Sequence, residues 1–404
     1  MQYKNRNFYI ESVSAANLVK KFGSPIYCYS KNRLVHNIEI FKQYFKSTSP
    51  LICFSVKSNS NSTLLRIIKS YGYGADVVSD GELKKVLSIG FDPSKIVYSG
   101  VGKKKLELDY AIKKNILLIN VESLSELKNI VHLAKKNRKI VNVGLRLNPN
   151  IDAKTNSKIS TGRLQDKFGL NEKEFLLIVK KYKHIKNINL KCLSVHIGSQ
   201  IISNKPYNKM LKVIDNILKK SDHKFSYVDL GGGMGIDYLN NDKIIDYRVL
   251  SKNVYNFAYK NKCKIIFEPG RSIVGDTAIL LTKIIYIKNS LNKKFIIIDA
   301  GMNDLIRPAL YDAIHEILPI KKNRSTVLME HDFVGPICET ADRFLRKKKY
   351  QKLDEGESLA IKDVGAYGYA LTSNYNLRPK PTEILIDKSK FKVISKKEKV
   401  QDLI

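Results

Sequence analysis

The stretch LICFSVKSN at residues 51–59 joins a buried-strand pattern to a polar end. Residues 51–56 are nearly all apolar or small, which is typical of a parallel strand that is covered on both faces. Seven similar runs follow, at residues 75–78, 96–98, 116–120, 141–147, 190–197, 227–230 and 264–267. Amphipathic stretches separate these runs, so the pattern predicts a closed (β/α)8 barrel, with an open doubly wound sheet as the alternative.

The amphipathic stretches between the strands have the features of helices. Ser79 precedes one of them as a candidate cap, and Glu82 follows three positions later, as in a capping box. A second helical pattern runs over residues 123–131. Together these signals support the alternation of strands and helices that a barrel requires.

The pattern changes after about residue 276. Strand-like runs at 279–287, 294–299 and 382–386 are joined by polar segments, and residues 26–29 form another such run. We expect a barrel over residues 31–275 and a mainly antiparallel β-domain built from residues 1–30 and 276–404. The length of 404 residues suits a barrel of about 250 residues with a second domain.

Composition narrows the class of protein. The chain has no apolar run long enough to span a membrane, and its start leads into no apolar segment of a secretory signal. Its five cysteines are scattered without metal-ligand spacing, so we expect reduced thiols, no metal site and a cytoplasmic location.

The positive charge is large but diffuse. Lys and Arg number 71 against 38 Asp and Glu, a formal balance of +33. The lysine runs are short, dispersed and not interleaved with aromatic residues as in a stacking platform. We interpret the excess as compositional drift, while a nucleic-acid binder, whose affinity would fall steeply with salt, is the alternative.

Chemistry-bearing residues follow the predicted strands, where a barrel builds its active site. Lys57 follows the first strand, His196 ends the sixth, glycines 231–233 follow the seventh, and Glu268 with Arg271 follows the eighth. Each has a structural alternative: a lysine reaching to solvent, a core histidine, a tight turn and a surface ion pair. As a set, they provide the amine, N–H donors, packing face and nitrogen partner that pyridoxal phosphate requires.

The chain resembles the diaminopimelate decarboxylases, pyridoxal-phosphate enzymes whose barrel is similar to that of alanine racemase. The resemblance is collinear from Lys57 to Tyr367. Its motifs lie at residues 54–59, 74–79, 196–200, 231–233, 268–271, 335–340 and 363–367. It implies a pyridoxal 5'-phosphate cofactor and a homodimer whose active sites are shared between subunits.

The resemblance also implies roles position by position. Lys57 matches the lysine that forms a Schiff base with the cofactor, His196 the residue stacked on its ring, and Glu268 the acid facing the pyridine nitrogen. Further residues lie in motifs that bind the cofactor in this family, namely Asp76, Ser199, Gly231, Gly232, Gly233, Gly270 and Arg271. Tyr367 matches a residue that contacts the cofactor or the substrate. Arg307 and Tyr311 match ligands of the substrate carboxylate, and Cys338 with Glu339 matches the pair that the partner subunit inserts.

The choice of reaction rests on two of these positions. An ionised Glu268 would keep the pyridine nitrogen protonated, so that the ring can accept electrons as CO2 leaves. The resemblance implies that racemases of this architecture have an arginine at this position, so a carboxylate here favours decarboxylation. Cys338 is the candidate general acid that protonates the carbon, and a small buried hydrophobe is the alternative.

The choice of substrate rests on the groups at its distal end. Arg271, Arg307 and Tyr311 suit a retained carboxylate, and Glu339 suits a distal ammonium. We therefore expect conversion of meso-2,6-diaminopimelate to L-lysine and CO2, which the resemblance implies is the last step of lysine biosynthesis. The alternatives are decarboxylation of carboxynorspermidine, ornithine or arginine, and a non-enzymatic carrier of pyridoxal phosphate.

Overall fold

The computed structural model of the chain describes residues 1–153, 156–290, 293–323 and 328–404. The chain divides into two compact units. The barrel unit contains Ile38–Asp237 and Asp242–Ser272, and the β-domain unit contains Met1–Asn37, Tyr238–Asn241 and Ile273–Ile404. Both ends of the chain therefore belong to the β-domain unit.

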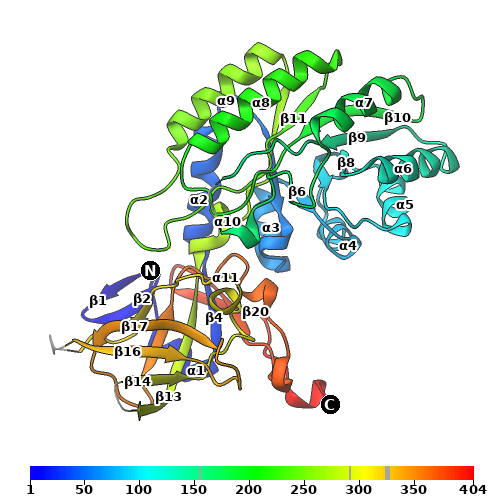
Figure 1. Cartoon of the computed structure of the whole chain (residues 1–404). Helices are drawn as coiled ribbons and strands as arrows, with labels where there is room; N and C mark the ends of the chain where they lie inside the picture. The colour runs from blue at the N-terminus through cyan, green and yellow to red at the C-terminus, as the bar shows by residue number, and fades with distance from the viewer. Residues whose placement is uncertain (154–155, 291–292, 324–327) are drawn as a thin grey trace. The chain divides into compact units, whose positions relative to one another are not determined.

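The barrel unit contains eight parallel strands that close on themselves (Figure 1). Around the barrel they follow the order β10-β11-β12-β5-β6-β7-β8-β9. Their bounds are β5 (Leu51–Ser55), β6 (Gly74–Val77), β7 (Ile96–Tyr98), β8 (Leu118–Val121), β9 (Val141–Arg146), β10 (Ile188–Ser194), β11 (Tyr227–Asp229) and β12 (Lys264–Phe267). The predicted closed (β/α)8 barrel is confirmed, and the open sheet is wrong because the last strand, β12, pairs with the first, β5, so that all eight strands form one ring.

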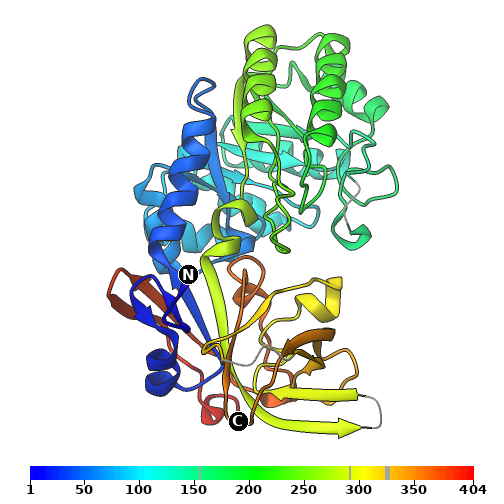
Figure 2. The same ribbon diagram turned by 90° about the vertical axis from the view of Figure 1, so that its left-hand side faces the viewer.

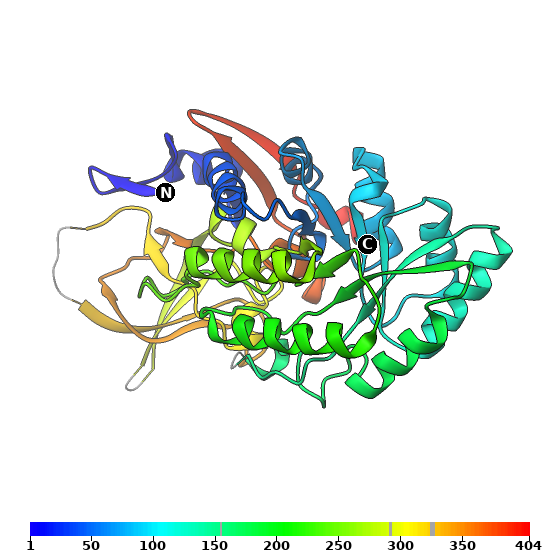
Figure 3. The same cartoon turned by 90° about the horizontal axis from the view of Figure 1, so that it is seen from above.

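Helices alternate with these strands and lie on their outer side, as the view from above shows (Figure 3). They are α3 (Ser62–Ser70), α4 (Asp80–Ile89), α5 (Lys105–Lys113), α6 (Leu124–Lys136), α7 (Glu172–Tyr182), α8 (Lys205–Ser221) and α9 (Tyr247–Asn261), and α2 (Lys31–Tyr44) precedes β5. The Ser79 side chain accepts the Glu82 N–H as expected of a cap. The return bond differs from a capping box, because Glu82 accepts the N–H of Val78, one residue before the cap.

The barrel interior changes from apolar to polar along the strands. Side chains from five strands pack into one apolar cluster that includes Cys53, Val97, Leu118, Cys192 and Ile266. Residues two positions further along a strand share the same face. Those next inward positions are polar and buried, namely Ser55, Ser99, Asn120, Ser194 and Glu268. The polar layer therefore lies at the carboxyl ends of the strands, where a barrel forms its site.

The β-domain unit is built on a nine-stranded sheet with the central order β17-β16-β14-β13-β4-β19-β20. Figure 2 shows that this unit combines the blue amino-terminal part of the chain with its yellow to red carboxyl-terminal part. The strands are β4 (Ile26–Ser30), β13 (Ala278–Ser290), β14 (Lys293–Ile298), β15 (Ile317–Pro319), β16 (Leu328–Val334), β17 (Arg343–Gln351), β18 (Ser358–Ile361), β19 (Thr382–Asp387) and β20 (Lys390–Ser395). Most pairs are antiparallel, as predicted, while β4–β19 and β14–β16 are parallel.

The amino-terminal segment helps to build the core of the β-domain unit. Three short strands, β1 (Gln2–Lys4), β2 (Asn7–Ile10) and β3 (Val13–Ser14), precede helix α1 (Ala15–Phe22). Their apolar residues Phe8, Ile10 and Leu18 pack with Ile26 of β4 and Ile279 of β13. Within the described ranges, no helix has the length and apolar character needed to cross a membrane.

Candidate active site

Lys57 lies in a 3₁₀ turn (Val56–Ser58) that directly follows strand β5. Its Nζ is 2.7 Å from Oδ2 of Asp76 on the neighbouring strand β6, and the Ser55 hydroxyl donates to the same oxygen at 2.7 Å. The Asp76 side chain is fully buried, whereas that of Lys57 is 33% exposed. A fixed carboxylate thus holds the amine, while part of the lysine side chain reaches solvent.

Glu268 follows strand β12, which is the neighbour of β5 on the other side. It is 5% exposed and accepts the Ser99 hydroxyl at 3.3 Å. Burial raises the pKa of Glu268 well above its usual range, and the charges of Asp229 and Asp76 raise it further. A cation beside Glu268 would oppose this shift and favour the ionised carboxylate.

Asp229 ends strand β11 and completes this group of buried acids. Its carboxylate accepts Asn120 Nδ2 at 3.1 Å and the Gly231 N–H at 2.9 Å. Burial also raises the pKa of Asp229. Three buried carboxyl groups at neighbouring strand ends therefore create an environment that suits a positively charged ligand atom.

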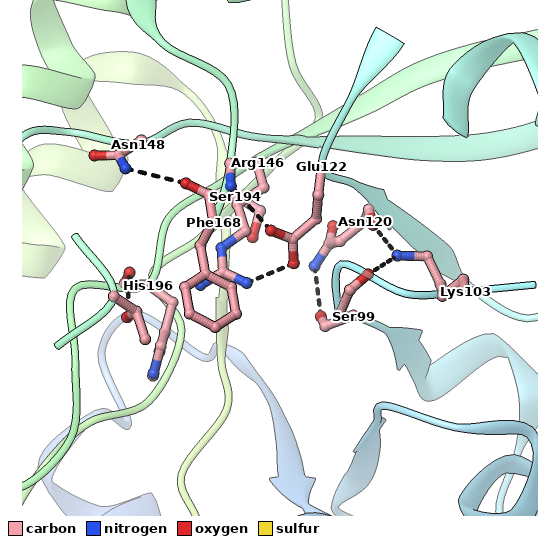
Figure 4. A network of polar contacts seen from close by, with 12 residues as sticks. Ser99, Lys103, Asn120, Glu122, Arg146, Asn148, Phe168, Ser194 and His196 are labelled. Carbon is pink, nitrogen blue, oxygen red and sulfur yellow. Dashed lines mark hydrogen bonds and ion pairs between the residues drawn. The ribbon is translucent and has the colours of Figure 1, made fainter. Parts of the chain in front are cut away.

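His196 follows strand β10 and is half-buried, so it is not part of the packed core (Figure 4). Burial lowers its pKa well below the usual range, and the positive charges of Arg146 and Lys57 lower it further. The Gly232 N–H donates to Nδ1 at 3.2 Å. Since the neutral ring accepts at Nδ1, its proton lies on Nε2, and the ring offers an uncharged flat face.

Glycines 231–233 form the turn after strand β11 and pass very close to neighbouring backbone. Gly231 and Gly233 have φ values of 64° and 92°, in the left-handed region. A methyl group on Gly232 would lie 2.0 Å from the Glu268 carbonyl oxygen. The turn therefore requires glycine, and it holds its N–H groups next to the strand ends.

Arg271 and Ser199 are brought together beside this turn. Arg271 begins the short helix α10 (Arg271–Val274), is 6% exposed, and donates from Nη2 to the Ser199 hydroxyl at 3.1 Å. Gly270 leaves no room for a side chain, since a methyl group would lie 2.9 Å from Ser58 Oγ. A guanidinium, a hydroxyl and a glycine turn are donors of the kind that bind phosphate.

A second buried ion pair flanks His196 (Figure 4). Glu122 Oε1 is 2.6 Å from Arg146 Nη1, and Glu122 Oε2 accepts the Gly169 N–H at 3.0 Å. The Arg146 guanidinium lies 4.8 Å from the centre of the Phe168 ring. Sequence reasoning missed this pair and Asp229. Arg146 and Asp229 are each one residue before the end of a predicted strand, which was an available signal.

Arg307 and Tyr311 lie in the β-domain unit, four residues apart on helix α11 (Arg307–Tyr311). Arg307 is 5% exposed and donates from Nη1 to Nε2 of His315 at 2.9 Å, and its guanidinium lies 4.7 Å from the Tyr238 ring centre. His315 in turn donates from Nδ1 to the Lys362 carbonyl at 2.7 Å. Helical spacing places Arg307 and Tyr311 on one face, and His315 holds the arginine.

Cys338 and Glu339 lie in the loop between β16 and β17, and both are exposed. Asp342 anchors this loop by accepting the N–H groups of Met302 at 2.7 Å and Ile337 at 2.6 Å. Tyr375 donates its hydroxyl to Glu339 Oε1, and Asn376 donates to Cys338 Sγ at 3.4 Å. An exposed thiol is not the small buried hydrophobe considered above.

Tyr367 is half-buried and has a φ of 55°, so the motif at 363–367 contains a left-handed residue that is not glycine. The contacts made by His315, Tyr375 and Asn376 were not foreseen. They join segments far apart in the chain, and no local pattern indicates them.

The comparisons with known proteins agree with this geometry. Residues 31–275 match the family described as "Pyridoxal-dependent decarboxylase, pyridoxal binding domain". The chain is 39% identical over 402 residues to the diaminopimelate decarboxylase of Aquifex aeolicus, which covers 98% of this chain and 95% of that protein. It is 38% identical over 408 residues to that of Haemophilus influenzae, covering 100% and 97%.

Solved structures of this family superimpose closely. The diaminopimelate decarboxylase of Helicobacter pylori complexed with L-lysine has a TM-score of 0.90 and 38% identity, covering 96% of this chain and 98% of that one. The M. jannaschii enzyme in co-complex with L-lysine has a TM-score of 0.93 and 35% identity, covering 100% and 96%. This chain therefore belongs to the diaminopimelate decarboxylase family of pyridoxal-dependent decarboxylases.

Proposed function

We propose that this chain removes CO2 from meso-2,6-diaminopimelate and yields L-lysine. The observation that carries the proposal is the meeting of Lys57, Asp76 and Glu268 at the ends of three neighbouring strands, β5, β6 and β12. Membership of the family and the lysine-bound relatives support the choice of substrate.

The residues of the barrel unit fit pyridoxal phosphate. Lys57 supplies the amine for its aldehyde, and the neutral His196 ring packs on its face. The excess of buried carboxyl groups around Glu268 suits a protonated pyridine nitrogen. Ser199, Gly233, Gly270 and Arg271 would bind the phosphate. Gly231 and Gly232, whose N–H groups donate to Asp229 and His196, would shape the turn around it.

When bound, pyridoxal phosphate supplies a ring that takes up the electron pair left when the bond to CO2 breaks. Glu268 keeps the positive charge of the ring nitrogen in place, and Asp76 holds the Lys57 ammonium until it transfers its proton. After CO2 leaves, Cys338 donates a proton from Sγ to the substrate carbon. Lys57 would supply the amine that takes the place of the product amine, so that L-lysine can leave.

Recognition of the distal end of the substrate is assigned to the β-domain unit and to Arg271. The carboxylate that is retained binds Arg271, Arg307 and the Tyr311 hydroxyl, and the distal ammonium binds Glu339. Tyr367 contacts cofactor or substrate. We also propose a cytoplasmic homodimer in which Cys338 and Glu339 serve the active site of the partner subunit, which agrees with their exposure in the single chain.

A substrate panel tests the proposal. Diaminopimelate, carboxynorspermidine, ornithine and arginine are assayed side by side for CO2 release, and we expect turnover of diaminopimelate to exceed that of the others. In parallel, borohydride reduction and peptide mass mapping should place the cofactor on Lys57. Bound cofactor without CO2 release from any substrate would favour a carrier instead, and faster turnover of another substrate would reassign the enzyme.

A further inference from the structure

Two consecutive residues near the carboxyl end of the chain contact the Cys338–Glu339 pair. Asn376 Nδ2 donates to Cys338 Sγ at 3.4 Å, and the hydroxyl of Tyr375 donates to Glu339 Oε1. The bond to Glu339 raises the pKa of Tyr375, so its hydroxyl remains the donor. Two neighbouring donors thus face two neighbouring acceptors.

Both segments are attached to the same turn at residues 301–304. The N–H of Met302 donates to Asp342, which also binds the N–H of Ile337 next to Cys338. The carbonyl of Asn303 accepts the N–H of Ser373 at 3.0 Å, two residues before Tyr375. Because adjacent residues of one turn hold both segments, the spacing between the donors and the acceptors is fixed.

The backbone at the donor residues is unusual. Asn376 and Leu377 have φ values of 56° and 52°, consecutive left-handed residues of which neither is glycine. Such a conformation is disfavoured for leucine and persists only where its surroundings enforce it. Here Asn374 donates to Glu398 Oε2 at 2.6 Å and to the Arg378 carbonyl at 3.1 Å, which fixes the segment on both sides.

We propose that Asn376 and Tyr375 are positioning residues for Cys338 and Glu339, an inference that rests on the proposed function. When Cys338 gives its proton to the carbon that has lost CO2, the S–H bond breaks, a C–H bond forms, and the electron pair stays on sulfur. The Asn376 N–H then stabilises the thiolate. Tyr375 holds the Glu339 carboxylate in the orientation that receives the distal ammonium of the substrate.

The test of Asn376 uses the complete holoenzyme and two substitutions. Asn376→Ala removes the donor, and Asn376→Asp keeps the left-handed preference but places a negative charge beside the sulfur. We expect the rate of iodoacetamide alkylation at Cys338, followed by peptide mass mapping at pH 7, to fall in the order wild type, N376A, N376D. From wild type to N376A, the alkylation rate should fall about three- to tenfold. The kcat should fall by a similar factor, and KM should stay unchanged.

Tyr375→Phe should change KM rather than kcat, which is the opposite of the result expected for Asn376→Ala. Without the hydroxyl, Glu339 is less well oriented, so KM for diaminopimelate should rise about three- to tenfold while kcat and alkylation of Cys338 stay near wild type. Matched controls are Tyr369→Phe, whose hydroxyl contacts Ser395 Oγ at 3.3 Å, and Asn240→Ala. Asn240 is also left-handed, with φ 51°, and donates to Glu316 at 3.0 Å.

Two outcomes would overturn the inference. In the first, N376A, N376D and Y375F behave like their controls in all three measurements. In the second, all of them lower kcat, raise KM and slow alkylation in parallel, as a general loss of structure would. Failure of the proposed function is a different result, namely that the wild-type protein makes no lysine, and the alkylation series still tests the contact between Asn376 and Cys338.

Discussion

The barrel mouth and the Cys338–Glu339 loop hold their functional side chains in opposite ways. Asp76 and Glu268 are buried. Asp76 accepts the Ser55 hydroxyl from the neighbouring strand β5, and Glu268 accepts the hydroxyl of Ser99, which follows β7, so their geometry is part of the barrel's own packing. Cys338 and Glu339 are exposed and receive hydrogen bonds from one short segment. The groups proposed for the aldehyde, ring and phosphate of the cofactor therefore all lie in the barrel unit, whereas the loop of the β-domain unit exposes its thiol and carboxylate to solvent.

The largest expected effect is on the barrel side of this comparison. Lys57→Ala should abolish CO2 release and the visible absorption of cofactor linked to lysine, because it removes the amine proposed to bind the cofactor, which lies 2.7 Å from Asp76. Absorption spectra and a CO2 assay measure both. Lys84→Ala is the control, since Lys84 also pairs with an aspartate at 2.7 Å but in an exposed position. Activity and absorption retained in K57A would remove the central assignment.

Cys338→Ala should affect the reaction without affecting the cofactor. Loss of a general acid lowers kcat by about 10²–10⁴-fold, while the absorption of bound cofactor should match that of the wild type. Cys263→Ala, at a half-buried cysteine, is the control. A wild-type kcat in C338A would show that another group protonates the carbon.

Mixing the K57A and C338A variants tests whether the Cys338–Glu339 loop of one subunit contributes to the active site of its partner. If K57A and C338A subunits exchange, each hybrid dimer contains one intact site. Recovery of about a quarter of wild-type activity is then expected for a twofold dimer. Subunit exchange without any recovery would instead confine each active site to one chain.

A smaller effect is expected at Arg307, the buried cation of the β-domain unit. His315→Leu removes the acceptor at 2.9 Å, so the guanidinium loses its orientation and KM for diaminopimelate should rise about three- to tenfold with little change in kcat. His315→Gln, which restores an acceptor, should recover part of the affinity. Steady-state kinetics distinguish these results, and equal KM values in all three proteins would contradict the role of His315.

The smallest effect concerns stability. Because burial raises the pKa of Glu268 in the folded, cofactor-free protein, its contribution to stability is fully present below the unfolded pKa and is lost as pH rises through the folded pKa. Glu268→Gln should therefore raise the Tm of the cofactor-free protein at pH 8 by a few degrees, about 2–4 °C per kcal/mol, while lowering activity. The gain should vanish near pH 4, and a gain independent of pH would contradict this explanation.

Much of the barrel could be predicted from the sequence because its strands are buried on both faces and appear as short apolar runs. The runs at 51–56 and 264–267, for example, coincide with β5 and β12. The residues at strand ends were found because the fold itself places them at one mouth. In the β-domain unit, β17 carries a run of exposed basic residues, and β16 exposes Leu328 and Met329 but buries His331 and Asp332, so neither strand shows a simple alternation of apolar and polar residues.

Partners that depend on tertiary structure could not be predicted. Lys103 begins one of the short lysine runs, at residues 103–105, that were interpreted as compositional drift. Its side chain is nevertheless 1% exposed, and its Nζ lies 2.7 Å from Glu126 Oε1. Asn376 and Cys338 are 38 residues apart and meet only because one turn supports both segments. No local periodicity or spacing encodes such contacts.

The place of strand β4 has a consequence for how the chain is made. β4 lies between β13 and β19, and its residue Tyr29 pairs with Ala278, about 250 residues later in the chain. At roughly 5–20 residues per second, this apolar strand is without its sheet partners β13 and β19 for at least about 12–50 seconds after it is synthesised. During that time the whole barrel leaves the ribosome, so we expect the barrel to fold first and the first strand of the large sheet to be the segment most in need of a chaperone.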